Sequence, residues 1–199
     1  MREGEPEYWD SVSRQTSLRN GGLRDNWPKR RKLGEMLMRW DWVGANVLEI
    51  GVGCGVTAAM LSLACGRMWE YIGTDVSQEF ISQAGHFGLD VVQADILSLP
   101  EGRFNRVLAL DSLEHVHPDD RDAGYKAIAD RMETGALLFI NMPYDESSHD
   151  MKFDHGIGLE DLVLFEKKGL NLLKYEHYTL KYKTFIRQYA FVVMTKGTQ

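Results

Sequence analysis

A glycine-rich segment carries the clearest chemical signal in this 199-residue sequence. A short apolar run, 47–50, is followed by Gly51, Gly53 and Gly55, and Glu49 stands inside the run just before the loop. Glycines let a backbone turn sharply and approach a ligand closely, and a helix that starts after such a loop offers free N–H groups to an anion. The segment predicts a nucleotide-binding loop of a kind that many nucleotide folds share.

Two acidic residues strengthen the nucleotide interpretation. Asp75 ends the next apolar run, where a carboxylate would accept hydrogen bonds from both ribose hydroxyls. Asp95 ends the run after that, and the apolar side chains of Ile96 and Leu97 would hold a purine ring beside it. We therefore expect Asp75 and Asp95 to contact a bound nucleoside.

Candidate general bases follow the fourth apolar run, 106–110. They are Asp111, His115 and His117. Histidine titrates near neutral pH, so either imidazole could take a proton from a hydroxyl group. The alternative interpretation is structural: His117 only precedes the helix start at Pro118, and His115 only packs beneath a lid.

A second polar cluster follows the fifth apolar run, 136–141. Its members are Asn141, Tyr144, His149, Asp154 and His155. Imidazole and carboxylate groups bind metals, but these residues lack the tight spacing of a ligand set. We therefore predict no metal site and interpret the cluster as a substrate-facing or solvated loop.

The spacing of apolar residues predicts an α/β fold. Helices are expected over 5–16 and 28–40, with Pro28 in the first turn of the second. Strands and helices then alternate, with strands over 47–50, 69–74, 90–93, 106–110 and 136–141 and helices over 56–65, 77–87, 118–132 and 159–168. The final runs, 170–180 and 185–195, have no helix between them and should pair antiparallel. Such alternation predicts a parallel sheet covered on both faces, with polar strand-end residues along one edge.

Four sequence runs in order, VLEIGVGCG, GTDVS, QADILSLP and FNRVLALDSLEHV, resemble the motif set of the class I S-adenosylmethionine-dependent methyltransferases. The resemblance covers the chain from about residue 40 onward. It implies a Rossmann-like seven-stranded sheet, mostly parallel with one antiparallel strand, and helices on both faces. It also implies one methyltransferase domain over 1–199, in which the helices within 1–40 form part of a lid.

The same resemblance implies roles for individual residues. Gly51 and Gly53 would pass beneath the methionine part of S-adenosylmethionine, and Glu49 and Gly55 would shape that pocket. The other implied contacts are Asp75 with the ribose, Val76 with the adenine, Asp95 and the Ile96 N–H with the polar edge of the adenine, the Leu110 carbonyl with the ammonium group, and Tyr8 and Trp9 closing over the site.

Charge and composition narrow the partners. The net charge of −6 would repel a phosphate backbone, so nucleic acid is disfavoured. No apolar run approaches the roughly 20 residues of a membrane helix, and Cys54 and Cys65 suit a reducing compartment as small buried residues. We expect a cytoplasmic monomer or homodimer with a small-molecule substrate and no nucleic-acid or membrane partner. The basic residues of segment 24–39 are interpreted as the solvated face of a helix, and they are Arg24, Lys29, Arg30, Arg31, Lys32 and Arg39.

The function implied is methyl transfer to an oxygen, nitrogen or carbon nucleophile of a small molecule by in-line displacement. One alternative is an NAD-dependent oxidoreductase, although Val56 is bulky where the dinucleotide fingerprint has its third glycine or alanine. Others are a non-catalytic cofactor-binding or interaction module, and a macromolecule methyltransferase using segment 24–39. The sequence Asn-Met-Pro-Tyr at 141–144 resembles the Asn-Pro-Pro-Tyr motif of amino-group methyltransferases, but it follows the fifth strand rather than the fourth, and we interpret it as coincidental.

Overall fold

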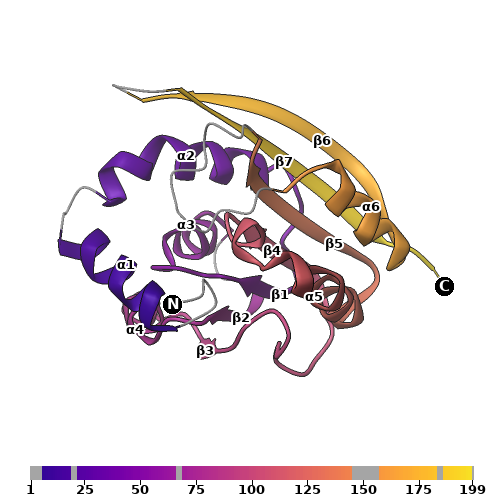
Figure 1. The fold of residues 1–199 in the computed structure, drawn as a ribbon, viewed down its shortest axis with the longest axis horizontal. Coiled ribbons are helices and arrows are strands. Elements are labelled where there is room, and N and C mark those ends of the chain that lie inside the picture. Colours follow the sequence, from indigo (N-terminus) through magenta and orange to yellow (C-terminus); the bar gives the residue numbers. More distant parts are fainter. Residues whose placement is uncertain (1–5, 19–21, 66–68, 145–156, 183–185, 199) are drawn as a thin grey trace.

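A seven-stranded sheet of order β3-β2-β1-β4-β5-β7-β6 forms the centre of the computed structural model (Figure 1), which describes residues 6–18, 22–65, 69–144, 157–182 and 186–198. Strands β1 to β5 run parallel, and β7 runs antiparallel to both β5 and β6. The predicted fold class is confirmed. The strands are β1 Ala45–Ile50, β2 Trp69–Asp75, β3 Val91–Gln93, β4 Phe104–Leu110, β5 Met132–Pro143, β6 Leu170–Lys181 and β7 Ile186–Lys196.

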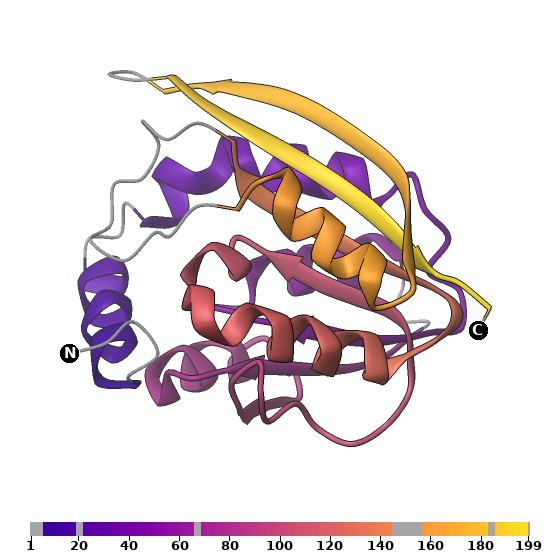
Figure 2. The same cartoon turned by 45° about the vertical axis from the view of Figure 1, so that its right-hand side comes forward.

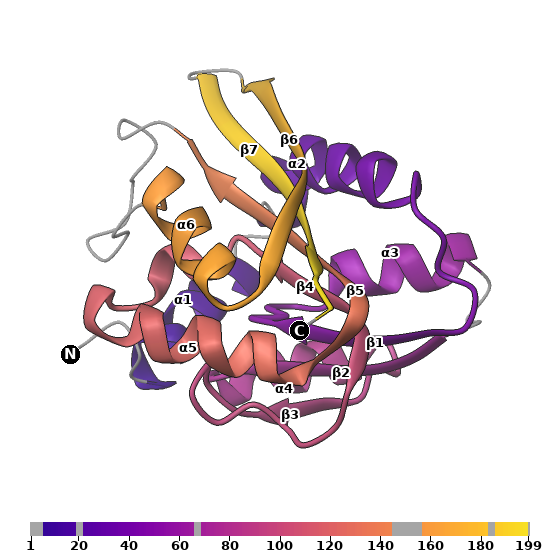
Figure 3. The same cartoon turned by 90° about the vertical axis from the view of Figure 1, so that its right-hand side faces the viewer.

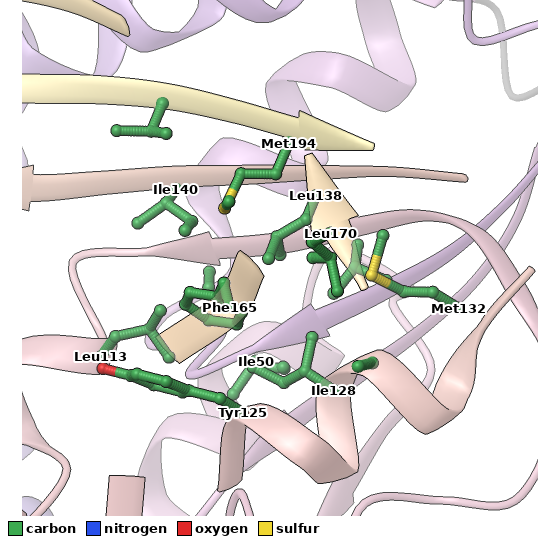
Figure 4. Packing of buried hydrophobic residues seen from close by; sticks show 14 of the residues in the cluster. Ile50, Leu113, Tyr125, Ile128, Met132, Leu138, Ile140, Phe165, Leu170 and Met194 are labelled. Carbon is green, nitrogen blue, oxygen red and sulfur yellow. The ribbon is translucent and has the colours of Figure 1, made fainter. Parts of the chain in front are cut away.

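Helices cover both faces of the sheet (Figure 3). Side chains alternate along a strand, so Val47 of β1 packs with α2 and α3 while Leu48 and Ile50 pack with α5 and α6. Figure 4 shows the second of these cores, with Tyr125 and Phe165 beside the sheet. The helices are α1 Pro6–Leu18, α2 Gly22–Leu37, α3 Val56–Cys65, α4 Gln78–Gly85, α5 Pro118–Arg131 and α6 Leu159–Lys167, with a short 3₁₀ turn at Leu113–His115.

The N-terminal helix α1 lies against α4, beside the carboxyl ends of the parallel strands (Figures 1 and 2). Gln83 Nε2 donates a 2.7 Å hydrogen bond to Ser13 Oγ, and Ser77 Oγ donates a 2.6 Å hydrogen bond to Asp10 Oδ1. These contacts place α1 next to the strand ends where ligands bind in such sheets.

Two boundaries differ from the sequence prediction by four residues or more. Helix α2 begins at Gly22 instead of 28, so Pro28 lies inside the helix. Proline removes only one amide hydrogen bond there, and the buried side chains of Leu33 and Met36 hold the helix to the sheet. Strand β5 begins directly after α5, at Met132 instead of 136, because Met132 pairs with the start of β4 before a shift in register.

A buried carboxylate joins α5 to α6. Arg121 Nη1 lies 3.2 Å from Asp161 Oδ1, and Tyr125 donates a 2.9 Å hydrogen bond to the same oxygen. The backbone N–H of Gly158 donates to Asp161 Oδ2 at 2.9 Å. Asp161 is only 1% exposed, and Tyr125 stacks on Phe165 with ring centroids 4.1 Å apart. The carboxylate therefore compensates a buried cation and two buried donors together.

Asp161→Ala should lower the free energy of unfolding by about 3–5 kcal/mol, because it removes the carboxylate that pairs with the buried Arg121 side chain among the described residues and the acceptor of the Tyr125 hydroxyl. Urea unfolding followed by circular dichroism measures the change. Asp130→Ala is the matched control, since Asp130 forms an exposed ion pair with Lys126 whose loss should cost about 0.5 kcal/mol or less. Equal losses for the two variants would contradict this account of Asp161.

Candidate active site

The glycine loop after β1 is held in a left-handed backbone conformation. Gly51, Gly53 and Gly55 have φ angles of 72°, 54° and 76°. A Cβ on Gly51 would lie 2.6 Å from Ser112 Cβ, and one on Gly55 would lie 2.9 Å from Ala84 Cβ, whereas one on Gly53 would meet nothing within 4 Å. Gly51 and Gly55 are thus required by protein packing, and Gly53 presents open backbone.

The Asp75 carboxylate is the polar centre of the loop. Its Oδ2 accepts a 2.8 Å hydrogen bond from the Gly53 N–H, and its Oδ1 accepts one of 2.9 Å from the Ser77 N–H. Burial raises the pKa of Asp75, while these amide hydrogen bonds oppose the shift. Val76 follows it, half-buried, and its carbonyl accepts a 3.0 Å hydrogen bond from Gln93 Nε2. The loop, the end of β2 and the start of α4 therefore share one carboxylate.

Glu49 lies beneath the loop, on the sheet face that α2 covers. Its side chain is 3% exposed, and Tyr71 donates a 2.7 Å hydrogen bond to Oε2. Burial raises the pKa of Glu49 to about 7, although the Tyr71 hydroxyl and the charge of Arg30 lower it in part. Glu49 therefore changes charge near neutral pH.

The residues after β3 and at the end of β4 are arranged differently from the loop. Asp95 is exposed, and its Oδ1 accepts hydrogen bonds from the Leu97 N–H at 2.9 Å and the Ser98 hydroxyl at 2.7 Å. Ile96 and Leu110 are each 8% exposed, and Ile96 packs toward Gly124. The predicted contacts of Asp95, Ile96 and Leu110 with the donor stay predictions.

Asp111, directly after β4, has a φ angle of 56°, and no other non-glycine residue in the described segments has a positive φ. Lys29 Nζ lies 2.8 Å from its Oδ2, and Asn141 Nδ2 donates a 2.7 Å hydrogen bond to its Oδ1. Tyr178 in turn donates a 2.7 Å hydrogen bond to Asn141 Oδ1. Both carboxylate oxygens of Asp111 are thus engaged by protein groups.

The two candidate histidines have different surroundings. The ring of His115 lies against Trp9, with centroids 4.7 Å apart, and Trp9 contacts Tyr8 at 5.1 Å. His117 is largely exposed and caps α5, since its Nδ1 accepts a 3.3 Å hydrogen bond from the Asp119 N–H. The structure therefore brings His115, rather than His117, together with the aromatic residues of α1.

A buried glutamate lies next to His115. Glu114 is 2% exposed, and its Oε2 has no hydrogen-bond partner in the part of the chain that the structure describes. Burial raises the pKa of Glu114 well above its usual range, and the nearby charge of His115 opposes that shift. The turn after β4 thus holds three ionisable side chains within five residues: Asp111, Glu114 and His115.

Two basic side chains, which the sequence analysis had assigned to a solvated helix face, lie at the site instead. Lys29 pairs with Asp111, and one Arg30 guanidinium nitrogen lies 3.4 Å from Cys54 Sγ in the glycine loop. The available signal was helical spacing, because Lys29 and Arg30 stand four and three residues before the buried Leu33. Arg31 and Arg39 show the predicted exposure.

The second polar cluster is only partly visible. Asn141 belongs to the Asp111 network, while Tyr144 is half-exposed and its ring lies 3.8 Å from that of His177. His149, Asp154 and His155 lie outside the described residues. Among the residues that are described, no group of three or more His, Cys, Asp or Glu side chains could hold a metal ion. No described helix is long and apolar enough to cross a membrane.

Residues 47–135 match the model of a family described as a methyltransferase domain. No curated protein matches the sequence. The sheet order and the antiparallel β7 also differ from the dinucleotide-binding fold, whose sixth strand is parallel.

Solved structures share the fold across most of their length. A chain in a complex of the Trm112 methyltransferase activator from Haloferax volcanii matches with a TM-score of 0.77 and 16% identity, covering 96% of this chain and 98% of that one. Magnesium protoporphyrin IX methyltransferase from Synechocystis, with bound S-adenosylhomocysteine, gives 0.74 and 13%, covering 96% and 98%. The N-methyltransferase NodS from Bradyrhizobium japonicum, also with S-adenosylhomocysteine, gives 0.73 and 14%, covering 88% and 91%. At these identities the likeness establishes the fold alone.

The ordered motifs, the sheet topology and the match over residues 47–135 together support assignment of this chain to the class I S-adenosylmethionine-dependent methyltransferase superfamily. The methyltransferase-domain match supports the predicted activity, an S-adenosylmethionine-dependent methyltransferase, with S-adenosylmethionine as the methyl donor. The described residues fit this donor, because Gly53 leaves a backbone surface open that any side chain would fill, and the Asp75 carboxylate lies beside it.

Stability should fall as pH rises from about 5 to about 8, because the folded state keeps a proton on Glu49 that the unfolded state releases above the usual pKa of 4.5. Glu49→Gln keeps an acceptor for Tyr71 and has no proton to lose, so this variant should lose roughly 2–3 kcal/mol less than the wild type over that interval. Urea unfolding at both pH values measures the difference. Glu35→Gln, at an exposed helix position, should keep the wild-type pH dependence. If the free energy of unfolding of Glu49→Gln fell with pH as steeply as that of the wild type, Glu49 would not be the group responsible.

Proposed function

We propose that this chain transfers a methyl group from S-adenosylmethionine to an oxygen, nitrogen or carbon nucleophile of a small molecule. The observation that carries the proposal is the open backbone of Gly53, hydrogen-bonded to the Asp75 carboxylate at the ends of β1 and β2. A nucleoside laid across this point would meet backbone on one side and an acid on the other.

The donor-binding roles follow from this placement. Asp75 accepts amide hydrogen bonds from Gly53 at Oδ2 and from Ser77 at Oδ1. Each carboxylate oxygen can accept more than one hydrogen bond, so the ribose hydroxyls could share it. Val76 would lie against the adenine, Asp95 would accept from its amino group, and the Ile96 N–H would meet a ring nitrogen. Leu110 would offer its carbonyl to the ammonium. Gly51 and Gly55 keep the loop close to Ser112 and Ala84. When bound, S-adenosylmethionine supplies a methyl group on a positively charged sulfur that needs no further activation.

His115 is the residue we assign as general base for an acceptor that must lose a proton. It follows β4 and lies under Trp9 of α1, which would exclude water from the acceptor. Asp111 is already engaged by Lys29 and Asn141, so we assign it to holding the turn instead of taking a proton. Alignment of the acceptor behind the methyl group would supply most of the acceleration, up to roughly 7–11 kcal/mol.

The acceptor class rests on charge and on the covering helix. The net charge of −6 disfavours a polyanion, and α1 leaves its aromatic residues next to His115, where a small acceptor would be enclosed. One neighbour of the fold is described as a magnesium protoporphyrin IX methyltransferase, which acts on a small molecule.

Isothermal titration with S-adenosylmethionine and S-adenosylhomocysteine tests donor binding directly. Heat of binding with both ligands is expected, and absence of heat together with no thermal shift would overturn the proposal. Stabilisation by NADH alone would favour an oxidoreductase. Donor binding without methyl transfer to any member of a broad acceptor panel would favour a non-catalytic module.

Gly53→Ala should weaken S-adenosylhomocysteine binding at least about tenfold, because the new methyl group occupies the open side of the loop. Gly44→Ala is the matched control, since Gly44 also has a positive φ, 65°, and nothing within 4 Å of an added Cβ. Both variants should lose about 1 kcal/mol of stability from backbone strain, and only Gly53→Ala should lose affinity. Calorimetry and thermal unfolding give the two readouts, and equal affinity in both variants would contradict the placement of the donor.

His115→Ala should lower turnover by about a hundredfold or more while leaving the affinity for S-adenosylhomocysteine within about twofold, because a general base acts only in the transition state. Initial rates with an acceptor from the panel measure the effect. His86→Ala, at the exposed C-terminus of α4, serves as the control, and His117→Ala compares the other candidate. Unchanged turnover in His115→Ala would remove it as base.

A further inference from the structure

Arg30 carries a buried N–H group for which the described structure provides no acceptor. Its Nε is shielded from solvent and has no hydrogen-bond partner, and one terminal nitrogen of the same guanidinium lies 3.4 Å from Cys54 Sγ. A thiol sulfur is a weak acceptor, so this contact satisfies little of the donor capacity of arginine. Buried donors without partners are rare in native proteins and indicate a missing ligand or water.

The direction of Arg30 is set by α2. Leu33 and Leu37, three and seven residues further along the helix, are buried against the sheet, so Arg30 points to that same side. Its contact with Cys54, which lies directly between the left-handed glycines Gly53 and Gly55, places the guanidinium at the glycine loop. The charge therefore stands where the donor would pass.

The neighbouring basic residues of α2 already have acidic partners. Lys29 pairs with Asp111 at 2.8 Å, and Arg31 pairs with Glu35 at 3.6 Å. The charge of Arg30 lowers the pKa of Glu49, so the two side chains are close enough to interact electrostatically. Glu49 Oε2 already accepts a hydrogen bond from the Tyr71 hydroxyl. Within the described ranges no ion pair joins Arg30 to an acid, which leaves its charge for a ligand.

We propose that Arg30 binds the carboxylate at the methionine end of S-adenosylmethionine. The inference rests on the proposed function and extends it to the recognition of one charged group. A planar guanidinium matches a carboxylate with two parallel hydrogen bonds, and the buried Nε would supply one of them. Because an amino acid end carries one charge of each sign, Arg30 would serve the carboxylate while Glu49, on the same sheet face, faces the ammonium side.

A set of three ligands separates recognition of the carboxylate from recognition of the nucleoside. They are S-adenosylhomocysteine, its decarboxylated analogue and 5′-methylthioadenosine, which lacks the whole amino acid end. The quantity measured by calorimetry is the ratio of the Kd of the decarboxylated analogue to that of S-adenosylhomocysteine. In the wild type this ratio should be at least about tenfold, as expected for a charge-assisted pair.

Arg30→Ala should bring the ratio close to one and leave the affinity for 5′-methylthioadenosine within about twofold. Arg30→Lys should give an intermediate ratio, since lysine keeps the charge and loses the paired geometry. Arg31→Ala is the matched control, an adjacent arginine whose side chain is 71% exposed, and it should keep the wild-type ratio. Thermal unfolding of each variant confirms folding, and if Arg30→Ala does not fold, the ratio in Arg30→Lys decides.

Three results would overturn the inference. An unchanged ratio in the Arg30 variants would show that another group binds the carboxylate. Equal weakening of all three ligands would show that Arg30 only supports the loop. In both of these cases the wild type still binds the nucleosides, and the proposed function stands. A wild type that binds none of the ligands would overturn the proposed function and this inference together.

Discussion

The hydrogen bond from the Gly53 N–H to the Asp75 carboxylate is the contact on which the site depends. It joins the loop after β1 to the end of β2 at 2.8 Å, and the second carboxylate oxygen binds the Ser77 N–H at the start of α4. Ser77 in turn donates to Asp10 of α1. A single carboxylate therefore holds the glycine loop and, through the Ser77 hydroxyl, connects it to helix α1.

The ionisable side chains between α2 and the sheet are only partly paired with one another, and this arrangement does not favour stability. Burying ionised groups is costly unless they are paired. Lys29 and Asp111 form an ion pair, and the Tyr71 hydroxyl donates a hydrogen bond to Glu49. Arg30 keeps an unsatisfied N–H instead, and Glu49 retains a pKa of about 7. Both groups border the glycine loop. The amino acid end of the donor carries one positive and one negative charge, and it would pair with both of them there.

The turn after β4 combines backbone strain with paired charges. Asp111 adopts a left-handed conformation that side-chain-bearing residues rarely take. Lys29 from α2 and Asn141 from β5 hold its carboxylate from two sides, and Tyr178 from β6 supports Asn141. Backbone strain of this kind persists only where the surroundings over-determine it. The turn after β4 thereby holds the His115 ring against Trp9.

Local sequence patterns predict the glycine loop, the position of Asp75 and most of the sheet. Glycines at alternate positions, acids at strand ends and apolar runs of strand and helix length specify the loop, Asp75 and the order of the sheet, because each depends on a few consecutive residues. Helix packing depends on distant partners instead. Several contacts arise only when the helices pack on the sheet. They are the inward direction of Lys29 and Arg30, the burial of Glu114, the hydrogen bond between Ser77 and Asp10, and the position of His115, rather than His117, beside Trp9. A basic residue on a helix reads alike in sequence whether it faces water or a carboxylate, and only the packed fold places the opposing charge beside it.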